Sequence, residues 1–381
     1  MSDSLIGLIK EIYTNDKTIP LHRPFLGKDE KSILKKTIDT GFVSTAGKYV
    51  EEFEKKIARF TKKKYSISTV NATSGLHIAL LANDVKADTE VLCPSLTFVA
   101  TSNVIRYCNA RPVYLEVDSN LNLSINSLKN FLYQNCEIRK DGYCWNRITN
   151  KKVTALILVH TLGLPSNEKL YFNLLKKFNI PIIQDNAAAL GSYYDRNHLG
   201  YSKCTSIISF NGNKIITTGG GGMILTNSKK IFEKCKFLST TAKKSHPFEF
   251  IHNSIGYNYR MPNLNAALGL AQFKKIKKII NKKRKIANLY EQWCINNDYK
   301  FIKEIKKGIS NYWVNAILFK SKKEKNDFLI RTNNMNIFTR PLWQPMHMLK
   351  MNTNFSKANL DNTKYLYDHI VCLPSYPDNL K

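Results

Sequence analysis

Short apolar segments alternate with amphipathic ones as far as residue 226, and this alternation constrains the fold more than any other feature of the chain. The expected strands are residues 65–70, 90–95, 111–117, 153–160, 180–185, 205–210 and 222–226, and the expected helices include 47–64, 76–83, 97–108 and 167–179. The segment VTALILVH is almost continuously apolar, which is typical of a strand buried on both faces. The alternation predicts an α/β fold with a mainly parallel sheet covered on both sides.

The chain has 381 residues, which is too many for one domain of about 150 residues. We expect an N-terminal helical lead-in at residues 1–21, a large α/β domain at 22–264 and a small C-terminal α+β domain at 265–381. A single long lysine-rich helix is expected to open the small domain. Residues 139–152 predict a surface hairpin. In open α/β sheets ligands bind at the carboxyl ends of the strands, so the site is expected there.

The chain carries 58 Lys and Arg against 29 Asp and Glu, a formal net charge of +29. Such a charge leaves nucleic-acid binding as an alternative. The basic residues, however, are spread in short runs along the chain and are not gathered with stacking aromatics. We therefore expect no nucleic-acid partner. A positive field of this kind attracts small anions such as nucleotide phosphates.

The eight cysteines form no C-x-x-C pair and have no histidine cluster beside them, so we expect reduced thiols and no metal site. No apolar run approaches the roughly 18 residues that a membrane span requires. The N-terminal segment lacks the basic start and long apolar stretch of a signal peptide. These features predict a cytoplasmic protein with no membrane insertion.

Two turns at expected strand ends carry side chains that suit a flat, phosphorylated ligand. Thr73 and Ser74, in NATSG, open a helix and would offer free backbone N–H groups to a phosphate. A plain helix cap is the alternative there. Phe98 follows the strand at 90–95 and could stack on a ring, or it could be a core residue.

Two further turns carry groups that can do chemistry. Asp185 ends an apolar strand and could hold a protonated heterocyclic nitrogen, or it could cap a helix. Ser209 and Lys214 lie in SFNGNK. A lysine kept out of bulk water has a lowered pKa and can form a Schiff base; the alternative is a solvated loop charge. The glycines at 219–222 would let the backbone turn sharply beside it. Phosphate donors, a stacking ring, an acid for a ring nitrogen and an amine nucleophile together match pyridoxal 5′-phosphate.

Longer stretches make a resemblance visible: FVSTAGKYVEEFE, VNATSGLHIAL, PSLTFVATSN, SFNGNKIITTGGGGMI and GYNYRMPNLNAALGLAQ. The chain resembles the DegT/DnrJ/EryC1/StrS family of nucleotide-sugar aminotransferases from about Ile19 to Pro374. The resemblance implies the type I, aspartate aminotransferase-like fold of pyridoxal phosphate enzymes. The hairpin at 139–152 and the stretch RPLWQPMHML are most similar to the LegC-like branch. That branch aminates a UDP- or GDP-linked 4-keto-6-deoxy-N-acetylhexosamine in legionaminic-acid-type surface-glycan synthesis.

The resemblance also implies roles for individual residues. Lys214 would be the Schiff-base lysine and proton shuttle, Asp185 would pair with the pyridinium nitrogen, and Phe98 would stack on the ring. The phosphate would be bound by the backbone N–H groups of Thr73 and Ser74 and by the hydroxyl of Ser209.

Three more residues follow from the same resemblance. Asn258, in GYNYRM, would reach the phosphate of the partner subunit's cofactor, which makes the active unit a homodimer. Trp343 and His347, in RPLWQPMH, would lie near the sugar nucleotide, although both could simply be packed residues.

One position departs from the family pattern. Three residues after the aspartate the family usually has Gln, Glu or His, and here the residue is Ala188. The loss of one hydrogen bond to the cofactor costs about 0.5–1.5 kcal/mol, and transamination with L-glutamate as donor remains the expected reaction. The alternative is a catalytically weak protein of the same fold that acts as a regulator or scaffold. A related branch replaces the lysine by histidine and catalyses dehydration; the presence of Lys214 argues against that reaction.

Overall fold

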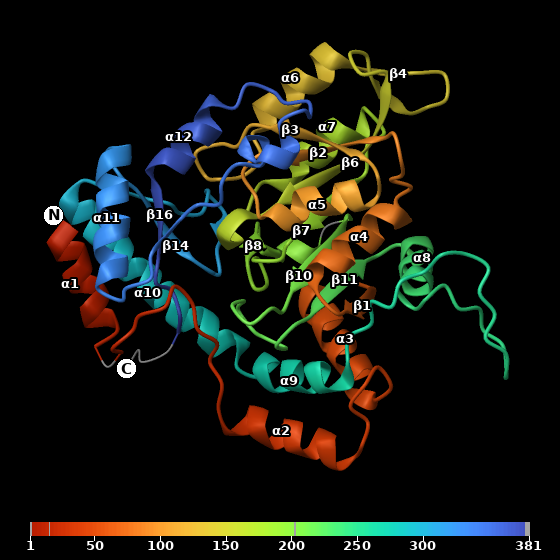
Figure 1. The fold of residues 1–381 in the computed structure, drawn as a ribbon, viewed down its shortest axis with the longest axis horizontal. Helices are drawn as coiled ribbons and strands as arrows, with labels where there is room; N and C mark the ends of the chain where they lie inside the picture. Colours follow the sequence, from red (N-terminus) through yellow and green to blue (C-terminus); the bar gives the residue numbers. More distant parts are fainter. Residues whose placement is uncertain (1, 15, 202, 378–381) are drawn as a thin grey trace.

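The computed structural model describes residues 2–14, 16–201 and 203–377. The last four residues of the predicted C-terminal domain, 378–381, lie outside the described residues, as do residues 1, 15 and 202. Figure 1 shows the main sheet with its helices in one part of the molecule, and helices α1 and α11 gathered in another.

The main sheet follows the order β1-β11-β10-β7-β6-β2-β3. The strands along this path are β1 (Tyr65–Thr69), β2 (Glu90–Pro94), β3 (Arg111–Leu115), β6 (Lys151–Val159), β7 (Ile182–Asp185), β10 (Thr205–Ser209) and β11 (Gly222–Thr226). The five strands from β10 to β3 are parallel, and β11 is antiparallel to both of its neighbours. All seven expected strands are present, and the prediction of a mainly parallel sheet is confirmed.

Helices cover the sheet, as the alternation predicts (Figure 1). They are α3 (Lys48–Thr61), α4 (Ala72–Ala82), α5 (Val99–Tyr107), α6 (Ile125–Asn135), α7 (Glu168–Lys176) and α8 (Lys229–Ser239), whereas α2 (Lys28–Asp39) packs on α9 (Asn263–Phe273) away from the sheet. Helix α4 begins four residues before the expected start at 76, because Asn71 caps it: the Asn71 side chain accepts the Ser74 N–H at 2.7 Å. The segment NATSG is therefore the first turn of a helix.

The expected surface hairpin is confirmed. Strand β4 (Cys136–Ile138) pairs antiparallel with β5 (Cys144–Asn146), and β5 in turn pairs antiparallel with β6. A smaller sheet joins β8 (Tyr193–Tyr194) to β9 (Asn197–His198) and to β13 (Gly308–Ile309). Because β13 comes from the C-terminal part of the chain, this sheet joins that part to the segment between β7 and β10.

The expected single lysine-rich helix is wrong, because the structure has two helices there. Helix α9 (Asn263–Phe273) ends, and α10 (Ile276–Asn297) begins, on either side of Lys275. The Lys275 amino group donates to both carboxylate oxygens of the buried Glu30, at 2.9 and 2.8 Å. The break therefore coincides with an ion pair that joins α9 and α10 to α2.

The C-terminal part has the expected α+β character. Strands β12 (Lys300–Phe301), β14 (Asn315–Leu318), β16 (Ile370–Leu373) and β15 (Arg340–Pro341) form an antiparallel sheet in that order. Helices α11 (Lys322–Asn334) and α12 (Asp361–His369) accompany it. Helix α1 (Ser2–Ile12) buries its apolar face in the same core cluster as Tyr290 of α10 and Phe328 of α11.

The domain boundaries after residues 21 and 264 stay predictions. Among the described residues, no helix combines the length and the apolar character that crossing a bilayer requires.

Candidate active site

A cavity of about 390 Å³ lies at the carboxyl ends of β2, β6, β7 and β10, beside the first turn of α4. Six of the predicted site residues line it: Thr73, Phe98, Asp185, Ser209, Lys214 and Trp343. A second cavity, of about 540 Å³, lies between α7 and residues 194–199 and 203–204, and its described lining includes none of the predicted residues. We place the site in the first cavity because strand ends and chemically capable side chains coincide there.

Lys214 lies in the loop between β10 and β11, where its backbone N–H donates to the Asn211 carbonyl at 3.0 Å. Its Nζ is 3.8 Å from the centroid of the Trp313 ring. Burial lowers the pKa of the amine from 10.5 to about 8, and the carboxylate of Asp185 opposes part of that effect. About half of such an amine is neutral at pH 8, and the neutral form is the nucleophile.

Asp185 ends β7 and is buried. The Thr101 hydroxyl donates to its Oδ2 at 2.8 Å, and the Ala187 N–H donates to its Oδ1 at 3.1 Å. Burial raises the pKa of this carboxyl, while those two hydrogen bonds and the charge of Lys214 favour the ionised form. The carboxylate oxygens keep lone pairs that could accept a hydrogen bond from a protonated ring nitrogen.

The start of α4 forms the other end of the cavity. Asn71 and Thr73 line it, and the Ser74 N–H is already engaged by Asn71. The Ser209 hydroxyl accepts the Asn211 N–H at 3.3 Å and can still donate. A Cβ on Gly222 would lie 2.5 Å from the Ala72 backbone nitrogen, so this glycine lets β11 approach the helix start.

Three aromatic rings form one wall. Phe98 is 54% exposed, and its ring centroid lies 5.9 Å from that of Trp343. The Trp343 ring is nearly parallel to that of Trp313, with centroids 6.2 Å apart and planes at 22°. Phe98 is therefore a half-exposed ring at a cavity, and the reading of Phe98 as a core residue is wrong. An exposed aromatic face of this kind can stack on a flat ligand.

Three predicted residues lie outside the cavity wall that the described residues form. The backbone N–H of Ser74, which was expected to bind phosphate, is engaged by the Asn71 side chain, and the Ser74 side chain is buried in α4. The Nδ1 of His347 is 2.6 Å from the Ser95 hydroxyl, and burial lowers the pKa of this imidazole. Asn258 is exposed and forms an isolated antiparallel bridge with Thr240. A single chain cannot place Asn258 against a partner, so its predicted role stays a prediction.

Sequence reasoning missed four residues around the cavity. Asn71 caps α4, and Thr101 holds Asp185. His160 lines the cavity at the end of β6, and its backbone N–H donates to the Asp185 carbonyl at 3.2 Å. Trp313 covers Lys214. The cap has a sequence signal, an Asn directly before a helical segment; the other three depend on how separate segments pack.

These groups fit pyridoxal phosphate. An amine with a lowered pKa can bond its aldehyde, a buried carboxylate can hold its ring nitrogen, a half-exposed ring can stack on it, and a helix start suits its phosphate. Ala188 lines the cavity without a polar side chain. The fold and the site together define a pyridoxal phosphate-dependent enzyme of the type I, aspartate aminotransferase-like class.

Comparison with known proteins narrows the class. The model of the DegT/DnrJ/EryC1/StrS aminotransferase family matches residues 24–380. The GDP-perosamine synthase of Escherichia coli O157:H7 is 34% identical over 336 residues, covering 88% of this chain and 87% of that protein. The chain belongs to the DegT/DnrJ/EryC1/StrS aminotransferase family. The predicted family, enzyme class and cofactor are thereby confirmed.

Solved structures agree on the fold. Helicobacter pylori PseC, an aminotransferase involved in the biosynthesis of pseudoaminic acid, superposes with a TM-score of 0.84 at 24% identity and covers 95% of this chain and 94% of its own. The PLP-form of Spr1654 from Streptococcus pneumoniae gives a TM-score of 0.83 at 19% identity and covers 96% of this chain and 95% of its own. The predicted fold class is confirmed.

Proposed function

We propose that this chain transfers an amino group from L-glutamate to the 4-keto carbon of a UDP- or GDP-linked 4-keto-6-deoxy-N-acetylhexosamine. The observation that carries the proposal is that the Lys214 amine and the Asp185 carboxylate line one cavity beside an aromatic wall. The E. coli relative, by its name a synthase of a GDP-linked amino sugar, supports a nucleotide sugar as acceptor. Surface-glycan synthesis is the proposed use of the product.

Each residue would have a defined task. Bound pyridoxal phosphate would supply an aldehyde for bonding to amines and a ring that accepts electrons. Lys214 would hold the cofactor covalently at rest and, once released, would move a proton to or from sugar C4. Asp185 would keep the ring nitrogen protonated. Phe98 would stack on the ring, and Thr73 and Ser209 would donate to the phosphate.

The outer part of the site would take the nucleotide sugar. Trp343 lies against Phe98 at the cavity, and we propose that Trp343 and His347 contact the sugar nucleotide. We also propose a homodimer in which Asn258 reaches the partner's phosphate site. Its segment carries Phe248 and Phe250, each 80% exposed, which suits a covered surface.

We place the reaction in the cytoplasm. All eight cysteines, each within the described ranges, are free thiols, the state that a reducing compartment maintains.

Replacement of Lys214 by alanine tests the proposal. We expect the variant to lose amino transfer, since no amine would remain to hold the cofactor or move the proton. Lys63→Met is the matched control, because burial lowers the pKa of Lys63 to about 8 as well, but Lys63 does not line the cavity. Purified enzyme would be given UDP- and GDP-linked 4-keto sugars side by side, with product analysis. Normal turnover by Lys214→Ala would defeat the proposal.

The same assay separates the alternatives. Cofactor binding without amino transfer to any keto sugar would support a catalytically weak regulator or scaffold, which the absence of a polar side chain at Ala188 prompts. Turnover of the GDP-linked sugar alone, or of the UDP-linked sugar alone, would fix the nucleotide.

A further inference from the structure

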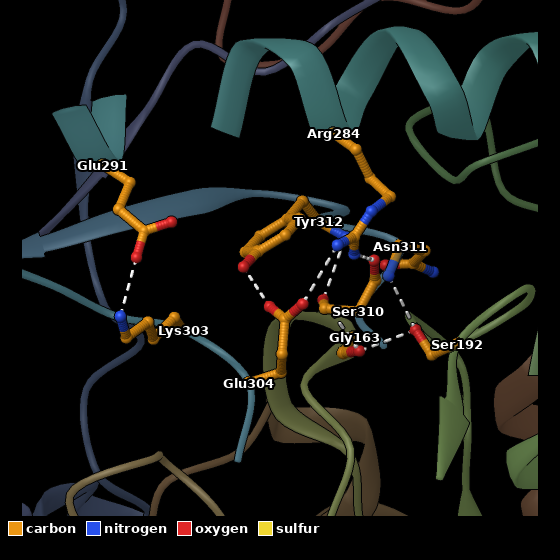
Figure 2. Close-up of polar contacts among 9 residues, drawn as sticks. All are labelled: Gly163, Ser192, Arg284, Glu291, Lys303, Glu304, Ser310, Asn311 and Tyr312. Atoms are coloured by element: carbon orange, nitrogen blue, oxygen red, sulfur yellow. Dashed lines mark hydrogen bonds and ion pairs between the residues drawn. The ribbon is translucent and has the colours of Figure 1, made fainter. Parts of the chain in front are cut away.

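A left-handed turn at Tyr312 brings the C-terminal part of the chain to the cavity wall. Its φ is 45°, a conformation that bulky residues rarely adopt. Figure 2 shows what holds the turn: Arg284 of α10 donates to the Ser310 carbonyl at 2.6 Å and to Glu304 at 3.2 Å. The Tyr312 hydroxyl donates to the other oxygen of Glu304. Strained backbone persists where surrounding contacts determine it, and such positions cluster at functional sites.

The residue before this turn, Asn311, is fully buried with all its side-chain polar atoms engaged. Its Nδ2 donates to the carbonyls of Ala188 and Leu190, at 2.8 and 2.9 Å. Its Oδ1 accepts the Trp313 N–H at 2.9 Å, and its own N–H donates to the Ser192 hydroxyl at 2.9 Å. One amide therefore binds both the loop that follows Asp185 and the residue that covers Lys214.

The loop after β6 meets the same amide. Gly163 has a φ of 85°, and a Cβ on it would lie 2.1 Å from the Asn311 Oδ1. The Gly163 carbonyl accepts from the hydroxyls of Ser192, at 2.7 Å, and Ser310, at 3.2 Å (Figure 2). Glycine is required here both for the left-handed backbone and for the close approach. The loops that follow β6 and β7 thus both meet the Asn311 segment.

Trp313 connects the Asn311 amide to the reactive lysine, Lys214. Its Nε1 donates to the Asn213 carbonyl at 2.6 Å, which fixes the indole beside the backbone that precedes Lys214. The lysine Nζ lies 3.8 Å from the indole centroid. The ring both attracts the ammonium form and excludes water from it. Burial lowers the pKa of this amine, and the Trp313 ring is one of the groups that cover it.

We propose that Asn311 is a positioning residue for Lys214: its amide holds the backbone of Trp313, whose indole covers the lysine, and fixes the loop that follows Asp185. The inference rests on the proposed role of Lys214 as the cofactor lysine. Under this proposal, residues of the C-terminal part of the chain influence the protonation of Lys214, which lies in the loop between β10 and β11 of the main sheet. Asn311 itself lies outside the cavity wall formed by the described residues, and acts through Trp313 and the Ala188 backbone.

The test is the pH profile of Lys214 labelling by an amine-specific acylating reagent in the cofactor-free protein, followed by peptide mass spectrometry. The midpoint for the natural protein is expected at about pH 8. Asn311→Ala frees Trp313 and admits water, so its midpoint should rise by about one pH unit. The neutral amine at pH 8 would then fall from about one half to about one tenth. The tryptophan emission should shift to longer wavelength.

Asn315→Ala is the matched control. Asn315 is an equally buried amide four residues along the chain, and its Nδ2 donates to the Ser375 hydroxyl at 2.9 Å, away from the cavity. Its midpoint should stay unchanged. An equal shift in both variants, or no shift in folded Asn311→Ala, would overturn the inference. If Asn311→Ala does not fold, Ser192→Ala decides, because it keeps the Asn311 side chain and removes the acceptor of the Asn311 N–H, together with the hydroxyl's own bond to the Gly163 carbonyl. A smaller upward shift supports the inference, and no shift overturns it.

Borohydride fixation of pyridoxal phosphate separates this inference from the proposed function. A label on a lysine other than Lys214 would defeat the proposed role of that lysine. A label on Lys214 together with an unchanged midpoint in Asn311→Ala would defeat the positioning role alone.

Discussion

Replacement of Thr101 by valine tests how the buried carboxylate of Asp185 is kept ionised. The Thr101 hydroxyl lies 2.8 Å from Asp185 Oδ2 and 2.8 Å from the Thr97 hydroxyl. Because an ionised carboxylate can only accept, Thr101 donates to Asp185, and Thr97 donates to Thr101. Valine keeps the branched shape and deletes both hydrogen bonds. A hydrogen bond to a charged group is worth about 1.5–3 kcal/mol, against about 0.5–1.5 kcal/mol for a neutral pair.

The sign of the pH dependence follows from Asp185. Burial raises the pKa of its carboxyl in the folded protein above the ordinary 3.8, so ionisation weakens the folded state as pH rises through the raised pKa. Valine raises that pKa further, because it removes a donor to the charged form. The free energy of unfolding of the variant should therefore fall short of the natural value by about 1.5–3 kcal/mol at pH 8, and by less in acid.

Urea denaturation of the cofactor-free protein at pH 8 and at about pH 4.5 measures the difference. Thr101→Ser is the control, because it keeps the hydroxyl, and it should show little pH-dependent loss. The reasoning would be refuted by a valine variant whose loss is the same at both pH values, or by a serine variant that loses as much as valine.

Two further substitutions probe the other ends of the cavity. Asn71→Ala removes the cap of α4 and should lower the free energy of unfolding by about 1 kcal/mol in urea denaturation; Asn71→Ser should recover most of the loss, and equal losses would contradict the capping role. Phe98→Ala should leave the unfolding transition almost unchanged, since the ring is 54% exposed. It should raise the dissociation constant of pyridoxal phosphate about tenfold through lost stacking, and an unchanged fluorescence titration would rule that stacking out.

The sheet could be predicted because each strand is marked by its own residues. Apolar runs bounded by turn residues predicted the seven strands from β1 to β3 along the path of the main sheet. The direction of β11 could not be found in this way, since GMILT has the same pattern in either orientation. The loop between β10 and β11 contains no described helix that could carry the chain back across the sheet, so the strand returns antiparallel. The break between α9 and α10 at Lys275 could not be predicted either, because Lys275 pairs there with Glu30, which is distant in the sequence.

For the site too, the residues marked by a local sequence pattern could be predicted, and those placed by distant contacts could not. Asp185 and Lys214 could be found because each follows a strand, and strand ends gather at one edge of a parallel sheet. Trp313 could not, because NYWVNAIL has the composition of a buried strand. Its place against the lysine depends on the left-handed Tyr312 and on bonds from Asn311 to a loop more than 100 residues earlier in the chain. No local pattern encodes such contacts.

A lowered pKa alone would not have identified the reactive lysine. Burial lowers the pKa of Lys63 to about 8 and that of Lys283 to about 7, much as it does for Lys214. Lys63 donates to the Cys204 carbonyl at 2.5 Å, and Lys283 donates to a backbone carbonyl at residue 375. In both cases the buried amine donates to a backbone carbonyl, which is a structural role. Lys214 differs because it lines a cavity together with the Asp185 carboxylate and the Trp313 ring. A nucleophile needs such a cavity, because its substrate has to reach it.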